Sequence, residues 1–235
     1  GPATTTDTVK MSQIVHDICP REKEFTSLMS EIRNDLLKII NANKSKYTTV
    51  LFGGSGTAIM ESVIASVVNK KKELLILING AYGYRMKQIA ETYSMPIKLL
   101  EFSSDQPINF NDVMKYLESN SNIGYVAMVH HETTTGVLNS ISQFSEVGKK
   151  YGHTLILDAI SSFAGIPINI KKTPIDYLMS TSNKCIQGMA GIAFAICNKS
   201  KINNLKNIPS NSFYLDLYKQ YSFMHRTDQM RFTPP

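Results

Sequence analysis

The chain has 235 residues, of which 43% are apolar and 19% are charged, and this composition excludes an intrinsically disordered protein. No run of 18 apolar residues predicts a transmembrane helix, and the first ten residues lack the basic and apolar regions of a secretory signal. The formal net charge of +6 comes from scattered basic residues, with one tight group at 69–73 that is typical of a solvated turn, so neither a membrane nor a nucleic acid is predicted as a partner.

Apolar runs and helical patterns alternate along most of the chain. In chain order they predict a helix at 22–42, a strand at 47–52, a helix at 57–69, a strand at 73–78, a helix at 85–93, a strand at 97–102, a helix with an asparagine cap at 110–120, a strand at 123–130, a helix at 141–152, and strands at 154–159, 175–180 and 191–197. This alternation indicates an α/β fold with a mostly parallel sheet sandwiched by helices.

From about residue 200 the sequence becomes polar, and no regular element is predicted there. The chain also begins and ends abruptly, which suggests that both ends are missing. We expect residues 1–20 to form an N-terminal arm and residues 21–235 to form one large domain, in which 200–235 is the end segment.

In an open parallel sheet, ligands bind beyond the carboxyl ends of the strands, so polar groups that follow predicted strands are candidate site residues. The first is the turn "GGSGTA" at 53–58, whose glycines, Ser55 and Thr57 precede a helix. Such a turn either cradles a phosphate or is only a tight capped connection. Neither a Gly-Lys-Ser/Thr nor a G-x-G-x-x-G pattern is present, so neither a Walker A loop nor a dinucleotide site is predicted.

Four further groups follow other strands: Tyr82 between two glycines, the segment "HETTTG" at 131–136, Asp158 and Lys184. Each group also has a purely structural explanation. Tyr82 could be a residue of the core, "HETTTG" could be a turn that caps its own backbone, and Asp158 and Lys184 could form a structural ion pair. Pyridoxal 5′-phosphate uses all of these groups together. It needs a lysine for a Schiff base, an acid opposite its ring nitrogen, a phosphate cup and a stacking ring.

No metal site is predicted. His130 and His131 are adjacent, and adjacent strand residues point to opposite faces. The three cysteines, Cys19, Cys185 and Cys197, contain no C-x-x-C motif, which favours a reducing, cytoplasmic location without disulfides.

Six segments closely resemble the 2-aminoethylphosphonate–pyruvate transaminase family, a branch of the class V aminotransferases within the fold-type-I enzymes. They are "GGSGTAIMES", "NGAYGYR", "HHETTTGVLN", "LDAISSFAGIP", "SNKCIQG" and "LDLY…RFTPP". The resemblance implies the large domain of a pyridoxal-phosphate-dependent aminotransferase. It also implies a small C-terminal domain, missing here, with an arginine for the anionic group of the substrate.

The resemblance implies a role for each candidate residue. Lys184 and Asp158 are catalytic: Lys184 binds the cofactor and moves the proton, and Asp158 pairs with the ring nitrogen. Tyr82 stacks on the ring, and Thr134 lies near the ring hydroxyl or the substrate. The cofactor phosphate is held by Ser55, Gly56 and Thr57, and by Thr233 of the neighbouring subunit, which implies a homodimer with shared active sites.

The implied reaction converts 2-aminoethylphosphonate and pyruvate into phosphonoacetaldehyde and L-alanine. An alanine–glyoxylate or serine–pyruvate transaminase of class V would share Lys184 and Asp158, although "HETTTG" and "CIQG" favour the phosphonate branch. A cysteine desulfurase is disfavoured, because that group usually has a histidine where this chain has Asn183. An alternative of another class is a non-catalytic α/β scaffold.

Overall fold

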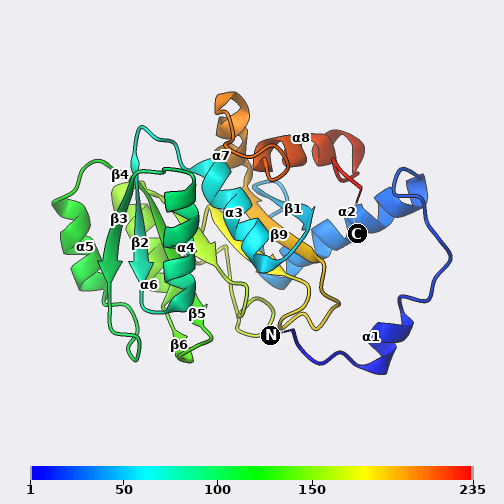
Figure 1. Cartoon of the computed structure of the whole chain (residues 1–235), viewed down its shortest axis with the longest axis horizontal. Coiled ribbons are helices and arrows are strands. Elements are labelled where there is room, and N and C mark those ends of the chain that lie inside the picture. The colour runs from blue at the N-terminus through cyan, green and yellow to red at the C-terminus, as the bar shows by residue number, and fades with distance from the viewer. Residues whose placement is uncertain (1, 234–235) are drawn as a thin grey trace.

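The computed structural model describes residues 2–233 and has a central sheet with helices packed around it (Figure 1). Gly1 and residues 234–235, the outer ends of the predicted arm and end segment, lie outside the described residues. The sheet has seven strands in the order β1-β9-β8-β7-β4-β2-β3, and β5 and β6 form a separate two-stranded sheet.

The strands and helices follow the predicted alternation closely as far as residue 198. The strands are β1 (Tyr47–Gly53), β2 (Glu73–Ile78), β3 (Ile97–Glu101), β4 (Ile123–Val129), β5 (His131–Glu132), β6 (Val137–Leu138), β7 (Thr154–Asp158), β8 (Tyr177–Thr181) and β9 (Ile192–Asn198). The helices are α1 (Asp7–Met11), α2 (Lys23–Ile39), α3 (Gly56–Val67), α4 (Ala81–Thr92), α5 (Phe110–Glu118), α6 (Ile141–Tyr151), α7 (Lys199–Asn203), the 3-10 helix η1 (Asn204–Asn207) and α8 (Leu217–Thr227).

The strand directions confirm a mostly parallel sheet. β2 runs parallel to β3 and β4, β4 to β7, and β7 to β8. β9 is antiparallel to both of its neighbours, β8 and β1, so β1 points the same way as the parallel strands. The reversal of β9 follows from its connection, because a loop without a helix joins it to β8, whereas a parallel strand needs a long crossover. The carboxyl ends of β1, β4, β7 and β8 therefore meet at one edge.

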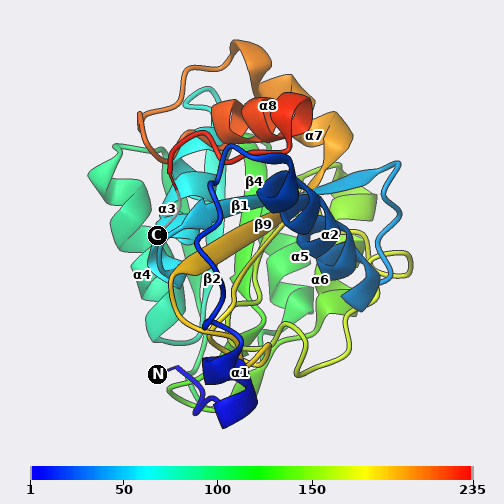
Figure 2. The ribbon, with the colours of Figure 1, turned by 90° about the vertical axis from the view of Figure 1, so that its right-hand side faces the viewer.

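Helices cover both faces of the sheet. Figure 2 shows α3 and α4 on one side, and α2, α5 and α6 on the other. The strands between these layers are almost wholly buried, which explains why they are continuously apolar in the sequence. Within residues 2–233, six helices begin at a residue whose side chain accepts an N–H group of the first turn, namely Thr6, Ser55, Asn109, Ser140, Asn198 and Asp216.

The prediction of an irregular region after residue 200 is wrong. The structure has α7, η1 and α8 there, and α8 buries Leu217, Tyr221 and Met224. These side chains recur at helical spacing, and the Asp216 carboxylate accepts the Lys219 N–H at 2.9 Å as a cap. Polar residues on the other face of α8 concealed this short apolar stripe.

Other elements differ from the prediction as well, among them the β5–β6 hairpin, which was not expected. Helix α4 begins at Ala81, four residues before the predicted start, so Tyr82 lies on the helix and not in a loop. Within the predicted arm, α1 forms but buries none of its residues. Across residues 2–233, no helix combines the length and the apolar character needed to cross a membrane.

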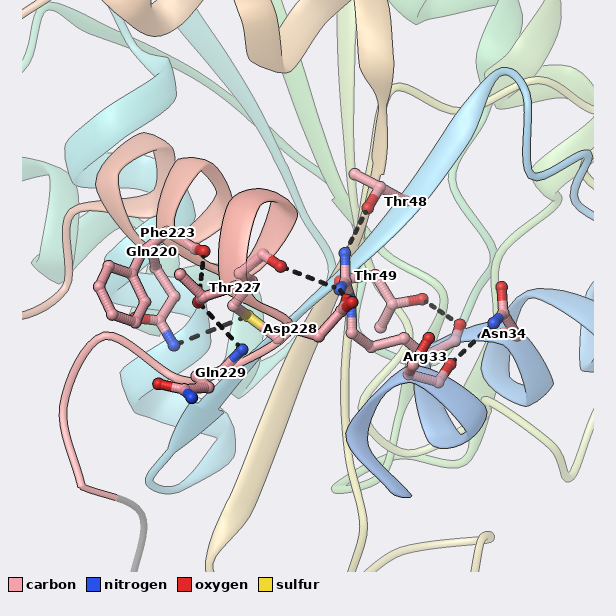
Figure 3. Close-up of polar contacts among 11 residues, drawn as sticks. Arg33, Asn34, Thr48, Thr49, Gln220, Phe223, Thr227, Asp228 and Gln229 are labelled. Carbon is pink, nitrogen blue, oxygen red and sulfur yellow. Dashed lines mark hydrogen bonds and ion pairs between the residues drawn. The ribbon is translucent and has the colours of Figure 1, made fainter. Parts of the chain in front are cut away.

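Arg33 joins three elements that are far apart in the sequence (Figure 3). From α2, its Nε donates to the Thr49 carbonyl on β1 at 2.9 Å, and its Nη2 donates to Thr48 Oγ1 at 3.3 Å. Its Nη1 donates to Asp228 Oδ1 at 3.0 Å and to the Met224 carbonyl at 3.4 Å, both at the end of α8. The Arg33 side chain is only 12% exposed, so these contacts anchor α8 in a region with little water.

Replacing Arg33 with alanine is expected to lower the free energy of unfolding by about 2–4 kcal/mol, because buried acceptors lose their donors. Asp228→Asn is the matched control. The Asp228 side chain is 51% exposed, so removing its charge should cost less than about 1 kcal/mol. Urea unfolding of both variants measures the difference, and equal losses would contradict the role of the buried carbonyl contacts.

Candidate active site

A cavity of about 460 Å³ opens where β1, β4, β7 and β8 end. Six of the predicted site residues line it: Ser55, Gly56, Thr57, Tyr82, Asp158 and Lys184. His131 and Thr133 of the candidate segment "HETTTG" also line it, as do Arg85, Ser161 and Thr181, which were not predicted as site residues. The sheet topology thus brings segments from across the chain to one place.

The turn after β1 is a capped connection that also borders the cavity. Ser55 caps α3, since its Oγ accepts the Ala58 N–H at 3.4 Å. Gly56 starts the helix in a tightly packed place, because a Cβ there would lie 3.0 Å from Ile160 Cδ1 and 3.2 Å from Thr181 Cγ2, and these side chains would have to move by a few tenths of an ångström. The α3 N-terminus thus borders the cavity, and a tight capped connection at this turn is compatible with a phosphate cradle.

The first turn of α4 contributes Tyr82 and Arg85. The Arg85 guanidinium carbon lies 4.8 Å from the centroid of the Tyr82 ring, and its Nη1 lies 3.5 Å from Thr57 Oγ1. Arg85 therefore connects the ring to the turn after β1. Arg85 was not a predicted site residue, because the helix was expected to start at 85 and the three-residue spacing from Tyr82 on one helix face was therefore not apparent.

Asp158 is a buried carboxylate at the end of β7, and it is 3% exposed. Burial raises its pKa to about 7, and the negative charge of Glu132 adds to the rise. The Ile160 N–H, which Asp158 Oδ1 accepts at 2.8 Å, acts in the opposite direction. A cation placed in the cavity would stabilise the ionised form of this group.

Lys184 lies in the loop between β8 and β9, where its side chain is half-buried and borders the cavity. Hydrogen bonds hold the loop around it: the Gln187 N–H donates to the Lys184 carbonyl at 2.8 Å, and Thr181 Oγ1 donates to Asn183 Oδ1 at 2.8 Å. The Ala3 N–H also donates to the Asn183 carbonyl at 2.9 Å, so the predicted N-terminal arm contacts the site.

The segment "HETTTG" supplies β5 and the turn of the β5–β6 hairpin, with Gly136 at a positive φ of 78°. Thr133 and His131 line the cavity, whereas Thr134 is exposed and is not among the lining residues. The proposed closeness of Thr134 to a bound ring thus stays a prediction. Thr233 is exposed and lies outside this lining too, and its reach into a neighbouring subunit also stays a prediction.

The two adjacent histidines bind successive serines. His130 Nδ1 lies 2.8 Å from Ser162 Oγ in the interior, and burial lowers the pKa of His130 to about 4. His131 Nδ1 lies 3.1 Å from Ser161 Oγ at the cavity. Within residues 2–233, no three histidine, cysteine, aspartate or glutamate side chains are grouped so as to hold a metal ion.

The sequence model of the family described as "Aminotransferase class-V" matches residues 9–233. The chain belongs to the class V aminotransferases. It is 40% identical over its whole length to 2-aminoethylphosphonate–pyruvate transaminases from Bacillus mycoides and Bacteroides fragilis, of which it covers 64% and 65%. This class V chain therefore spans slightly less than two thirds of those relatives.

A solved structure shows the same fold. The alanine–glyoxylate aminotransferase from Nostoc sp. superposes with a TM-score of 0.91, over all of this chain and 62% of that chain, at 24% sequence identity. The predicted fold class and the predicted membership of the class V aminotransferases are thus confirmed.

Proposed function

We propose that the protein containing this chain transfers the amino group of 2-aminoethylphosphonate to pyruvate with the help of pyridoxal 5′-phosphate. The observation that carries the proposal is that Lys184, Asp158, Tyr82 and the turn at 55–57 line one cavity. The substrates are taken from the names of relatives that are 40% identical. The products would be phosphonoacetaldehyde and L-alanine.

The cavity residues fit the cofactor. Gly56, where a Cβ would be tightly packed, lies at the α3 N-terminus, whose N–H groups favour a phosphate. The buried carboxyl of Asp158 has a raised pKa, and a protonated ring nitrogen would supply the cation that stabilises its charge. Tyr82 offers a ring face. When bound, the cofactor supplies an electron sink for the carbon that bears the amine.

Two side chains of this chain would carry the proton chemistry. Lys184 Nζ removes the proton from the substrate carbon that bears the amine, acting as a general base within the half-buried loop. The Asp158 carboxylate keeps a proton on the ring nitrogen, since its own burial favours a close cationic partner. Thr57 and Ser55 donate to the phosphate and fix its position.

A homodimer with shared sites is part of the proposal. Thr233 is exposed and lies outside the cavity lining of its own subunit, which is compatible with a role at the cofactor phosphate of a neighbouring one. A cytoplasmic location remains a prediction from the cysteine content.

The full-length protein, loaded with pyridoxal phosphate and given no keto acid, is expected to lose its yellow absorbance when 2-aminoethylphosphonate is added. Pyruvate should restore the colour, because the amino group held by the cofactor then passes to pyruvate and leaves as alanine. Visible spectra with serine and alanine in parallel cuvettes measure the specificity. Bleaching by serine or alanine alone would instead indicate a sister transaminase, and a protein that stays colourless with the cofactor would contradict the proposal.

A further inference from the structure

Glu132 is a fully buried carboxylate that the proposed reaction does not use. It lies on β5, and its two oxygens accept N–H groups from the first turn of α4. Oε2 accepts the Tyr82 N–H at 3.2 Å, and Oε1 accepts the Gly83 N–H at 3.0 Å. The first N–H groups of a helix lack partners within the helix, and a carboxylate there gains two charge-assisted hydrogen bonds.

Helix α4 cannot cap itself, because its N-cap residue is Gly80, which has no side chain to accept a hydrogen bond. Glu132, about fifty positions further along the chain, takes over that task. Gly80 has a φ of 178°, an extended conformation that any residue can adopt. A Cβ at Gly80 would nevertheless lie 2.5 Å from Glu132 Cδ and 2.6 Å from Oε2. The glycine is thus required by the space that the carboxylate occupies, not by its backbone angles.

The turn that Glu132 holds is the turn that faces the candidate site. Tyr82 and Arg85 line the cavity from it, with the Arg85 guanidinium carbon 4.8 Å from the Tyr82 ring centroid. Glu132 itself is not among the lining residues. Its effect on a bound molecule must therefore pass through the start of α4.

We propose that Glu132, seated against Gly80, is a positioning residue that fixes the first turn of α4 so that Tyr82 and Arg85 face the cofactor. This inference rests on the proposed function. It predicts that substitutions at Gly80 and at Glu132 have coupled effects, although 52 positions separate the two residues in the sequence.

A double-mutant cycle tests the contact itself. Melting temperatures are measured for the full-length protein without cofactor, for Gly80→Ala, for Glu132→Ala and for the double variant. Gly80→Ala should lower the melting temperature of the unsubstituted protein strongly and that of Glu132→Ala little, because the clash needs both groups. Equal shifts in the two backgrounds would show that Glu132 does not occupy the space beside Gly80, and would overturn the inference.

A second variant tests the effect on the cofactor and leaves the core filled. In Glu132→Gln, the amide nitrogen faces one of the two N–H donors and cannot accept from it. Cofactor affinity should fall by about tenfold, the change expected when one charge-assisted hydrogen bond is lost. The visible circular dichroism of the bound cofactor should change as well, which a purely structural role would not produce.

Glu118→Gln is the matched control, since Glu118 is an exposed carboxylate that also accepts two hydrogen bonds, from Lys150 and Tyr151. It should leave both the affinity and the dichroism unchanged. Unchanged values in Glu132→Gln would overturn the positioning role while the proposed function stands. If the unsubstituted protein binds no pyridoxal phosphate, the proposed function fails and the positioning role fails with it, whatever the melting cycle shows.

Discussion

Lys184→Ala is expected to abolish both amino transfer and the covalent attachment of the cofactor to the full-length protein. Alanine has no amine to join the cofactor and none to take the proton from the substrate carbon. The loss in kcat should be on the order of 10⁴-fold or more, because one residue supplies both the covalent link and the general base. Single-turnover absorbance with 2-aminoethylphosphonate measures it.

Lys184→Arg is the control that separates charge from chemistry. Arginine keeps the positive charge near Asp158, but it stays protonated and cannot serve as a base. The variant should be as inactive as Lys184→Ala and should still fold, as melting curves can verify. If Lys184→Arg retained a rate within about tenfold of the parent, a different group would be the base, and the assignment would be wrong.

Asp158→Asn is expected to stabilise the cofactor-free protein at pH 8 while it disables the site. The folded-state pKa of Asp158 is about 7, above its ordinary value of 3.8. Between these two pH values the folded chain holds a proton that the unfolded chain has released, so stability falls as pH rises from about 4 to 7. Above pH 7 the ionised Asp158 side chain lowers the free energy of unfolding by its full amount, up to about 4 kcal/mol for a pKa shift of about three units.

Urea unfolding at pH 5 and pH 8 measures this effect. The parent should lose stability between the two pH values, and Asp158→Asn should lose less, because an amide does not ionise. Cofactor affinity and kcat should fall sharply in the variant, kcat on the order of 10³-fold, since nothing then holds the proton on the ring nitrogen. A variant that is less stable than the parent at pH 8 would contradict burial as the dominant cause of the raised pKa.

Asp176→Asn controls for a largely buried carboxylate, 16% exposed, that lies away from the cavity. Burial raises the pKa of Asp176 too, its Oδ2 accepts the Leu155 N–H at 3.0 Å, and it does not line the cavity. The substitution should alter the pH dependence of stability and leave cofactor binding unchanged. A loss of cofactor affinity in this variant as well would indicate that Asp158→Asn acts through the fold and not at the ring nitrogen.

The local pattern of the sequence determined most elements as far as β9, because buried strands and amphipathic helices each need apolar side chains at a set spacing. It also identified the polar groups that end the strands, including Asp158 and Lys184. The helix α8 was not predicted, because polar residues separate the apolar residues Leu217, Tyr221 and Met224 in the sequence. These three side chains form one buried stripe only when the helix packs against the rest of the fold.

Only the tertiary structure decided which of these groups meet. The pairing of β9 with β1, the anchoring of α8 by Arg33 and the seating of Glu132 against Gly80 all join residues that are far apart in the chain. Arg85 and Thr133 border the cavity because of where α4 begins and how the hairpin turns. Residue type and spacing record what each segment buries, whereas contacts between distant segments depend on strand order and close packing, which no local pattern contains.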